Sequence, residues 1–306
     1  MGRFILKRLG HGIIVIFGVS LRVFVVTRLI GDPVRVMLPI EATAEQRIAF
    51  EKRLGLDRPI HVQFVNYLGS IARGDFGDSL WQRRPAMDIV VERLPLTIQL
   101  TVAGIGLAVL LGLPLGVWVA LKPGGISDRL VVFCGLLGLS VPQFWLGLLL
   151  IVVFAVKLRW LPTSGAAGLR HMILPVLTLA LPALARIVMM VRSAMIDELN
   201  QQYIKTAIAK GLPFRRVIGV HAMRNVAVPI LTLAGWELIR ALAGYSVVVE
   251  TVFAFPGLGL TAIQAIERQD LILLQAIVFT VAVMVVFIII AMDLLYKLID
   301  PRIELT

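Results

Sequence analysis

Long apolar stretches alternate along the chain with shorter polar connections. A helix needs roughly 20 mostly apolar residues to cross about 30 Å of hydrocarbon, and six stretches fit that requirement: 9–30, 96–121, 130–156, 172–191, 226–253 and 271–296. This pattern predicts an all-α integral membrane protein with six transmembrane helices. The first stretch exceeds the roughly 7–15-residue apolar core of a signal peptide, and no small-x-small cleavage site follows it, so we expect it to remain as a helix.

The longest polar connection covers residues 31–95, between the first two apolar stretches. It carries nine basic and nine acidic residues, so it has no net charge. Thr43 and Gln46 have the spacing of a capping box, which predicts a short helix that runs to about Leu54 and ends at Gly55. The segment fits either a packed cap without chemistry or a docking surface for a partner.

A second helix is expected in the same connection. Pro59 is suited to the start of a helix and Gly74 to its end, because proline fixes φ and glycine accepts the left-handed conformation. Between them, helical spacing places four apolar residues on one face: Phe64, Val65, Leu68 and Ile71.

Composition supports the membrane assignment and excludes other classes of protein. Hydrophobic residues make up 58% of the chain and charged residues 16%, against about 25% charged in soluble domains. The mean hydropathy is +0.91. The single cysteine, Cys134, cannot form a disulfide within its own chain, which excludes a disulfide-stapled secreted scaffold.

The net charge of +11 is unevenly distributed and predicts the orientation. With the N-terminus in the cytoplasm, the inner connections (1–8, 122–129, 192–224 and 297–306) hold 13 Lys and Arg residues, and the short outer loops (157–170 and 254–270) hold four. Basic residues in short loops stay on the cytoplasmic side. We therefore expect both termini in the cytoplasm and residues 31–95 facing outward, and no nucleic-acid partner.

Glycines and prolines within the apolar stretches indicate close helix packing. Gly112 and Gly116 lie four residues apart, which lets helix backbones approach in lipid. Prolines leave carbonyl groups unpaired, and this is tolerated where neighbouring helices or water satisfy them. They fall in or near the stretches at Pro142, Pro175, Pro182 and Pro229. A helix bundle follows from these features.

The inner connection 192–224 differs from the others because it is long, polar and rich in helix-favouring residues. Lys210-Gly211-Leu212-Pro213 combines a helix stop with a helix start, which predicts two short helices meeting at a fixed elbow. Ala207 and Ala209 leave room for a close partner, and positive charge comes from Lys205, Lys210, Arg215 and Arg216. A basic hairpin resting on anionic lipid and a docking element for a cytoplasmic protein both fit.

Charged residues within the apolar stretches are candidate functional groups, because a charge deep in a membrane is costly. They are Arg22, Arg186, Glu237 and Arg240. Glu237 and Arg240 are three residues apart on one helix face, and we favour local pairing between them. Arg22 could meet Glu237 or Glu250, or line a wet passage.

Two further acidic residues, Glu250 and Asp293, lie near the ends of apolar stretches. The cost of a charge is smaller there, and we expect contact with lipid headgroups to account for both of them.

Catalysis and cofactor binding are poorly supported by the sequence. No H-E-x-x-H motif is present, and the histidines are scattered (His11, His61, His171 and His221), so no metal site is predicted. The dipeptide Gly-Lys does not occur, which excludes a P-loop. We expect no enzyme activity and no cofactor on this chain, so any ATP and Mg²⁺ must be bound by another polypeptide.

Several motifs, in order, resemble those of binding-protein-dependent ABC importer permeases, most closely the dipeptide/oligopeptide/nickel branch. In the first half these are Gly31-Asp32-Pro33, Leu54-Gly55-Leu56-Asp57-Arg58-Pro59 and Arg73-Gly74-Asp75-Phe76-Gly77. Later come Tyr203-x-Lys205-Thr206-Ala207-x-Ala209-Lys210-Gly211, His221-Ala222-x-Arg224-Asn225, Glu250-Thr251-Val252-Phe253 and Asp300-Pro301-Arg302. The resemblance runs over nearly the whole chain and implies the type I importer permease architecture.

The resemblance also implies an ATPase-coupling loop at about 199–224. The residues that match are Tyr203, Lys205, Thr206, Ala207, Ala209, Lys210, Gly211, Arg224 and Asn225. The sequence departs from the broad family signature in two places. Lys205-Thr206-Ala207 replaces Glu-Ala-Ala, and Met223-Arg224 replaces Leu-Pro, which favours the peptide branch.

As a permease of this kind, the chain is expected to import small peptides across a bacterial inner membrane by alternating access. The implied partners are a homologous second permease, two cytoplasmic ATPase subunits and an external solute-binding protein. The expected divisions are 1–30, the outward segment 31–95, the permease core 96–299 and the tail 300–306. Import of glutathione or chelated nickel, and an ion-coupled secondary transporter, remain as alternatives.

Overall fold

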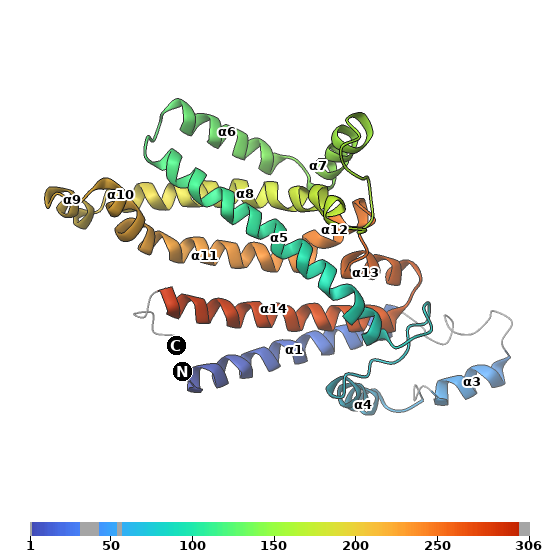
Figure 1. Cartoon of the computed structure of the whole chain (residues 1–306). Helices are drawn as coiled ribbons and strands as arrows, with labels where there is room; N and C mark the ends of the chain where they lie inside the picture. Colours follow the sequence, from blue (N-terminus) through green and yellow to red (C-terminus); the bar gives the residue numbers. More distant parts are fainter. Residues whose placement is uncertain (1, 31–42, 54–56, 300–306) are drawn as a thin grey trace. The chain divides into compact units, whose positions relative to one another are not determined.

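A computed structural model describes residues 2–30, 43–53 and 57–299. Within these ranges every regular element is a helix (Figure 1), and extended backbone pairs in an isolated bridge between Asp78 and Pro85. The chain divides into two compact units, Met1–Leu96 with Gly257–Val286 and Thr97–Pro256 with Phe287–Thr306. The all-α prediction is confirmed. The Gly31-Asp32-Pro33 motif, the end of the first short helix at Leu54 and Gly55, and the tail 300–306 lie outside the described residues.

Five helical segments of the described chain are long and apolar enough to cross a membrane. Four are single helices: α1 (Gly2–Ile30), α5 (Ala86–Ala120), α8 (Leu169–Leu199) and α14 (Leu271–Ile299). The fifth is the run Phe214–Val252. A sixth results if one bent pair of helices counts as a single span, which agrees with the six apolar stretches of the sequence.

The third predicted span is not a straight helix. It consists of α6 (Ile126–Ser140), α7 (Gln143–Leu150) and the π-helical η1 (Ile151–Lys157), with a bend of 102° after α6. Val141, at the bend, has φ −85° and ψ 123°. Proline excludes the preceding residue from the helical region, so Pro142 explains the break.

The second predicted span begins earlier than expected. The apolar stretch starts at residue 96, whereas α5 starts at Ala86. The first turns of α5 carry three charged residues, Asp88, Glu92 and Arg93, among apolar ones. Hydropathy marks only the apolar part of a helix, which is why the earlier start was not predicted. The helix α5 extends into the segment 31–95 that was assigned to the outward region.

In the first unit, both short helices of the 31–95 segment are present. They are α3 (Ala44–Arg53) and α4 (Ile60–Ala72). Pro59 precedes α4, and Gly74 ends it with φ +74°. Val65 departs from the prediction, because it is 65% exposed instead of packed with the other apolar residues of its face.

Aromatic side chains join α4 to α1. Phe64 of α4 lies 5.1 Å from Phe24 and 5.8 Å from Phe17, measured between ring centroids, and Tyr67 lies 5.4 Å from Phe24. Burial raises the pKa of the Tyr67 phenol to about 12.

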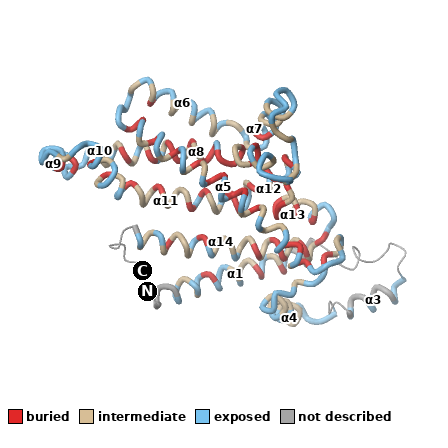
Figure 2. The backbone as a smooth tube through the Cα atoms, in the orientation of Figure 1, coloured by how far each residue is buried: buried red, intermediate tan, exposed pale blue. Residues whose placement is uncertain are grey.

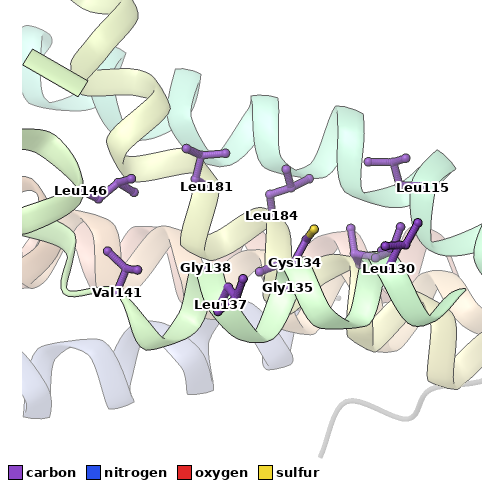
Figure 3. A pocket seen from close by; sticks show the side chains of 13 residues that line it. Leu115, Leu130, Cys134, Gly135, Leu137, Gly138, Val141, Leu146, Leu181 and Leu184 are labelled. Carbon is purple, nitrogen blue, oxygen red and sulfur yellow. The ribbon is translucent and has the colours of Figure 1, made fainter. Parts of the chain in front are cut away.

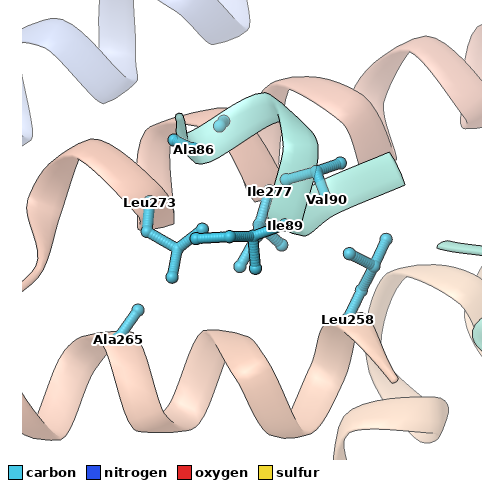
Figure 4. Packing of buried hydrophobic residues seen from close by; sticks show 8 residues of the cluster. Ala86, Ile89, Val90, Leu258, Ala265, Leu273 and Ile277 are labelled. Atoms are coloured by element: carbon cyan, nitrogen blue, oxygen red, sulfur yellow. The ribbon is translucent and has the colours of Figure 1, made fainter. Parts of the chain in front are cut away.

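The core of the first unit lies between the start of α5, α13 (Leu258–Glu267) and α14. Figure 4 shows Ile89 and Val90 of α5 facing Leu258, Leu273 and Ile277, and all five are buried. These residues are apolar and come from three helices, so their burial holds the helices together through the hydrophobic effect.

The same unit has a polar cluster at the start of α14. The buried carboxylate of Asp270 accepts hydrogen bonds from the hydroxyl of Ser79 (2.5 Å) and from the backbone N–H groups of Trp81 (3.1 Å) and Leu273 (3.1 Å). The guanidinium of Arg268 lies 5.7 Å from the ring centroid of Trp81. These bonds fix the segment before α5 to the start of α14.

In the second unit, α8 is the central helix. Its buried residues run from Leu174 to Met195 (Figure 2), whereas the neighbouring α6 buries only Asp128. Glycines of α5 pack directly on α8, because a Cβ on Gly104 or Gly116 would lie 2.5 Å from Leu179 or Val191. The close backbone approach expected from Gly112 and Gly116 is confirmed.

The run Phe214–Val252 contains two π-helical segments. It proceeds through α10 (Phe214–Arg216), η2 (Val217–Ala222), α11 (Met223–Arg240), η3 (Ala241–Tyr245) and α12 (Ser246–Val252). π turns inside α-helices are frequent at functional sites, and η2 and η3 lie beside the two groups of candidate residues described next.

Candidate functional site

The predicted elbow is formed by a short helix, α9 (Gln202–Ala209), and the turn that follows it. Gly211 has φ +77°. Its N–H bonds to the carbonyl of Ile208 (2.9 Å), and the N–H of Leu212 bonds to the carbonyl of Ala207 (3.3 Å). This pair of bonds is a Schellman motif, which requires the left-handed conformation at Gly211. Pro213 then precedes the next helix.

One part of the elbow prediction is wrong. Two short helices were expected between the spans, but only α9 is separate. The residues after Pro213 start the long run Phe214–Val252, and residues 192–199 are the last turns of α8. The polar sequence of these end turns concealed their continuity with the apolar helices, so the true connection is 200–213.

A polar cluster holds α9 against the ends of both neighbouring helices. The hydroxyl of Tyr203 donates a hydrogen bond to the Glu198 carboxylate at the end of α8. The side-chain amide of Asn225, in α11, donates to the same carboxylate (2.7 Å) and to the Tyr203 oxygen (3.1 Å). Desolvation and the bond to Glu198 raise the Tyr203 pKa to about 12, so the phenol remains a donor at physiological pH. We call Glu198, Tyr203 and Asn225 the latch.

The sequence identified two of the three latch residues and missed Glu198. Its partner Asn225 lies 27 residues away, and such a contact has no local signature. The available signal was an acidic residue in the last helical turn, where negative charge opposes the helix dipole and needs a donor.

The two faces of α9 differ in burial. Ile204 and Ala207 are buried, and they fix the helix to the second unit. The other predicted coupling residues are exposed: Lys205, Thr206, Ala209, Lys210, Gly211 and, in α11, Arg224. Ala207 therefore packs within the chain, whereas it was expected to make room for a partner. Figure 2 shows α9 as largely exposed.

The exposed surface around α9 is mixed in character. Beside the basic residues it presents Ile208 (49% exposed) and Phe214 (52% exposed). Large apolar groups rimmed by polar ones mark an interaction surface. We call Lys205, Thr206, Ile208, Ala209 and Phe214 the α9 surface.

A second group of candidate residues lies midway along α8 and near the end of α11. The fully buried carboxylate of Glu237 accepts two hydrogen bonds from Arg186, at 2.7 and 2.8 Å. Arg240 also approaches it, with 3.5 Å between nitrogen and oxygen. The expected local pair of Glu237 with Arg240 is thus present, but the stronger partner is Arg186 on another helix. We call these three residues the intramembrane cluster.

Other charged residues of the apolar stretches differ from expectation. Glu250 is fully buried and accepts a hydrogen bond from the Thr97 hydroxyl (2.7 Å), and Asp293 is also buried. The expected exposure of both to lipid headgroups is therefore wrong. Arg22 is exposed on α1, and the described part of the chain gives it no ion-pair partner.

An ion pair between the buried Asp128 and the half-buried Arg192 joins α6 to α8 and was not predicted. Arg192 binds both oxygens of the Asp128 carboxylate, one of them at 2.7 Å, and the backbone N–H of Gly124 donates to Asp128 as well (2.7 Å). The pair links residues 64 positions apart, so sequence spacing alone could not reveal it.

The second unit also has an apolar pocket of about 450 Å³. Figure 3 shows leucines of α5, α6 and α8 and the thiol of Cys134 lining it. The pocket offers no charged group to a polar solute. Among the described residues, no three His, Cys, Asp or Glu side chains are grouped to hold a metal ion.

Comparison with protein families gives two adjoining matches. The family described as "Binding-protein-dependent transport system inner membrane component" matches residues 112–305. The N-terminal model of the same transport systems matches residues 1–101. Together they include both the latch and the intramembrane cluster.

Curated relatives are similar over almost their whole length. The di/tripeptide transport system permease protein DppB of Pseudomonas aeruginosa is 39% identical over 98% of both chains. The oligopeptide permease AppB of Bacillus subtilis is 35% identical, over 99% of this chain and all of the other. The glutathione permease GsiC of Salmonella typhimurium is 37% identical over 99% of both chains.

Solved structures share the fold. The chain resembles the inward-facing MetNI methionine ABC transporter in its CY5 native crystal form, with a TM-score of 0.60 and 20% identity. The likeness covers 70% of this chain and 97% of the other.

Proposed function

The chain belongs to the family of binding-protein-dependent transport system inner membrane components, and from this premise we propose that it imports small peptides. At the level of the family, it is a multi-pass inner membrane permease of an ABC importer that works with a binding protein and an ATPase. It does not hydrolyse ATP itself, because that reaction belongs to the ATPase subunits.

The names of the relatives support peptides as the solute. Di- and tripeptides, oligopeptides and glutathione, itself a tripeptide, appear in the names of permeases 35–39% identical to this chain. These solutes share a peptide backbone and a terminal carboxylate. None of these three names mentions nickel, so peptides are the solute class that we propose.

We further propose that the α9 surface docks on a cytoplasmic ATPase subunit. The observation that carries this proposal is the set of hydrogen bonds that hold α9, in the Schellman turn at Gly211 and in the latch. A docking element on a flexible tether would absorb the movement of the motor. Because the latch joins α9 to the ends of α8 and α11, displacement of α9 would move both helices.

The transport cycle then follows from population shift. Closure of the ATPase on ATP would stabilise the outward-facing arrangement through its differential contacts with α9, and hydrolysis would release it. The proposed assembly has two permeases, of which this chain is one, and two ATPase subunits. Both termini would lie in the cytoplasm and residues 31–95 outside, in line with the distribution of basic residues.

A pair of glycine variants tests the coupling proposal. A Cβ on Gly211 or on Gly219 would meet nothing within 4 Å, but only Gly211 has positive φ. A β-branched residue is a steric outlier there, and the left-handed conformation costs about 1–2 kcal/mol for L-residues. We expect Gly211→Val to insert normally yet lose peptide uptake and binding-protein-stimulated ATPase activity in the reconstituted importer, and Gly219→Val to keep both. Normal uptake by Gly211→Val would refute the coupling assignment.

A direct uptake assay tests the substrate. The reconstituted importer should accumulate a labelled dipeptide or tripeptide, and unlabelled peptides should compete more strongly than a nickel chelate. Accumulation of the chelate without peptide uptake would overturn the substrate proposal and leave the coupling proposal unaffected.

A further inference from the structure

The intramembrane cluster carries an excess of positive charge. One carboxylate, that of Glu237, faces the two guanidinium groups of Arg186 and Arg240, and both of its oxygens are already bound by Arg186. The separation of 3.5 Å between Arg240 and Glu237 exceeds the usual 2.7–3.2 Å of an N–H···O bond. The Arg240 side chain is 52% exposed, so the surplus charge lies on the surface of its unit.

The depth of Arg240 makes lipid an unsuitable neighbour. It lies at the middle of the apolar stretch 226–253 and is 12 residues from the end of α12 at Val252, which is about 18 Å along a helix. A guanidinium at this depth faces a bundle interior, a watery cavity or a partner charge, because hydrocarbon cannot solvate it.

The surroundings of Arg240 leave space for a ligand. Trp236, one turn earlier on the same face, is 58% exposed, and the small residues Ala243 and Gly244 are exposed one turn later. A Cβ on Gly244 would meet nothing within 4 Å. The π-helical η3 starts directly after Arg240, in the kind of position where such turns mark functional sites.

From this arrangement we propose that Arg240 binds the carboxylate of the solute as it crosses the membrane. A guanidinium presents a planar fork of donors that matches a carboxylate. Arg186 contributes indirectly, because by binding both oxygens of Glu237 it leaves the Arg240 head available. The C-terminal carboxylate is present in every linear peptide, so its capture suits a pathway that accepts varied side chains. This inference rests on the proposed function of peptide import.

A thiol probe beside Arg240 tests the proposal in the complete importer. Cys134 is the single cysteine, so Cys134→Ser provides a background in which Gly244→Cys carries the only thiol of this chain. With each rate divided by that of the same reagent with a small free thiol, we expect a negatively charged methanethiosulfonate reagent to modify it about tenfold faster than a positively charged one, because of the nearby guanidinium. Arg240→Gln should bring that ratio close to one, and a dipeptide should slow modification only when Arg240 is present.

The control thiol is Gly219→Cys in η2, where a Cβ also meets nothing within 4 Å. The ratio of its reaction rates with the two reagents should not respond to Arg240→Gln. A Gly244→Cys thiol that reacts with neither reagent would mean that lipid or a neighbouring subunit covers this face, and would overturn the proposal. A ratio independent of Arg240, or an absence of protection by dipeptide in an importer that takes up dipeptides, would overturn it as well.

Uptake kinetics provide a second measurement. Arg240→Gln should raise the KM for a dipeptide about tenfold or more, given the strength of hydrogen bonds to charged groups, and Arg240→Lys should recover part of the loss. Lys157→Gln removes an exposed cation elsewhere and should leave KM unchanged. If the wild-type importer takes up no peptide, the proposed function fails, whereas the reagent ratio still reports whether the site attracts anions. An unchanged KM in Arg240→Gln would refute the inference alone.

Discussion

Removal of the Glu237 carboxylate should destabilise the second unit strongly. Glu237 is fully buried, its partner Arg186 is only 24% exposed, and two hydrogen bonds of 2.7 and 2.8 Å join them. Glu237→Gln leaves the Arg186 guanidinium without a counter-charge. Removing one partner of a buried ion pair costs about 3–5 kcal/mol, and we expect about 3 kcal/mol because glutamine can still accept one hydrogen bond.

The expected loss is large enough to measure by thermal unfolding of the purified permease complex. At about 2–4 °C per kcal/mol for a unit of this size, Glu237→Gln should lower the melting temperature by about 6–12 °C. The matched control is Glu92→Gln. Glu92 also pairs with an arginine, Arg84, at 2.7 Å, but both side chains are more than 40% exposed, and a surface pair of this kind contributes little. We expect no measurable change.

A double variant tests whether Arg186 and Glu237 stabilise the second unit as a pair. Glu237→Leu alone should destabilise more than Arg186→Leu alone, because it leaves Arg186 without a counter-charge, whereas Arg240, 3.5 Å away, can still pair with Glu237 in Arg186→Leu. The double variant should be more stable than either single variant, since apolar replacement of a buried pair is often neutral. Additive losses in the double variant, or a melting temperature of Glu237→Gln equal to that of the wild type, would refute the reasoning.

Three further outcomes follow from contacts in the second unit. Gly116→Ala should destabilise the unit by about 1–3 kcal/mol through overpacking, because its Cβ would lie 2.5 Å from a valine of α8. Gly106→Ala, with open space around it, should be tolerated. Equal melting temperatures of the two variants would contradict this. Asp128→Asn should weaken the joint between α6 and α8 by leaving the half-buried Arg192 guanidinium without a counter-charge, and a new protease cut near residue 124 should report it. Tyr203→Phe should be less stable than wild type below pH 10, and the difference should vanish between about pH 10 and 12. The reason is that the folded protein holds the phenol proton with a raised pKa of about 12, so the stabilising protonated form is lost as the pH rises through this range. A difference that stays constant with pH would count against the latch.

The sequence predicted features that depend on local residues and missed those that depend on distant ones. Gly211 and Pro213 define the elbow through their own backbone restrictions, so its position could be read directly. The bend at Pro142 had a visible cause, but hydropathy measures the length of an apolar stretch and not its direction, so a straight span was expected. The two outcomes differ because glycine and proline restrict the backbone at their own positions, whereas hydropathy reports only the length of an apolar stretch.

The polar contacts show the same limit. A spacing of three residues made the pair Glu237 and Arg240 apparent, yet the principal partner, Arg186, is 51 residues away. Of the two partners of Glu198, Asn225 is likewise remote, at 27 residues, whereas Tyr203 is five residues away across the end of α8. Charge in an apolar stretch predicts that a partner exists, but only the packing of helices identifies it.

The polar contacts of α8 explain how a movement of α9 could reach the middle of the membrane. Arg186, Arg192 and Glu198 follow one another at intervals of six residues, and six residues turn an α-helix by about 600°, or 240° beyond one full turn. Successive residues therefore point in three directions about 120° apart. They bind, respectively, Glu237 in α11, Asp128 in α6, and the latch partners in α9 and α11.

Arg186 and Glu198 both bind side chains of α11, so these contacts join α8 to α11 at two levels. Single contacts join it to α6 and α9, and rotation or sliding of α8 alone would break at least one charged hydrogen bond. Hydrogen bonds to charged groups contribute about 1.5–3 kcal/mol each, more than thermal energy supplies at one contact. If α9 docks on the ATPase as proposed, a displacement applied at α9 would pass along α8 to the level of Glu237. There it would act on the helix that carries Arg240, the residue that we propose to bind the solute, so α8 and α11 would link the proposed docking surface to the proposed solute site.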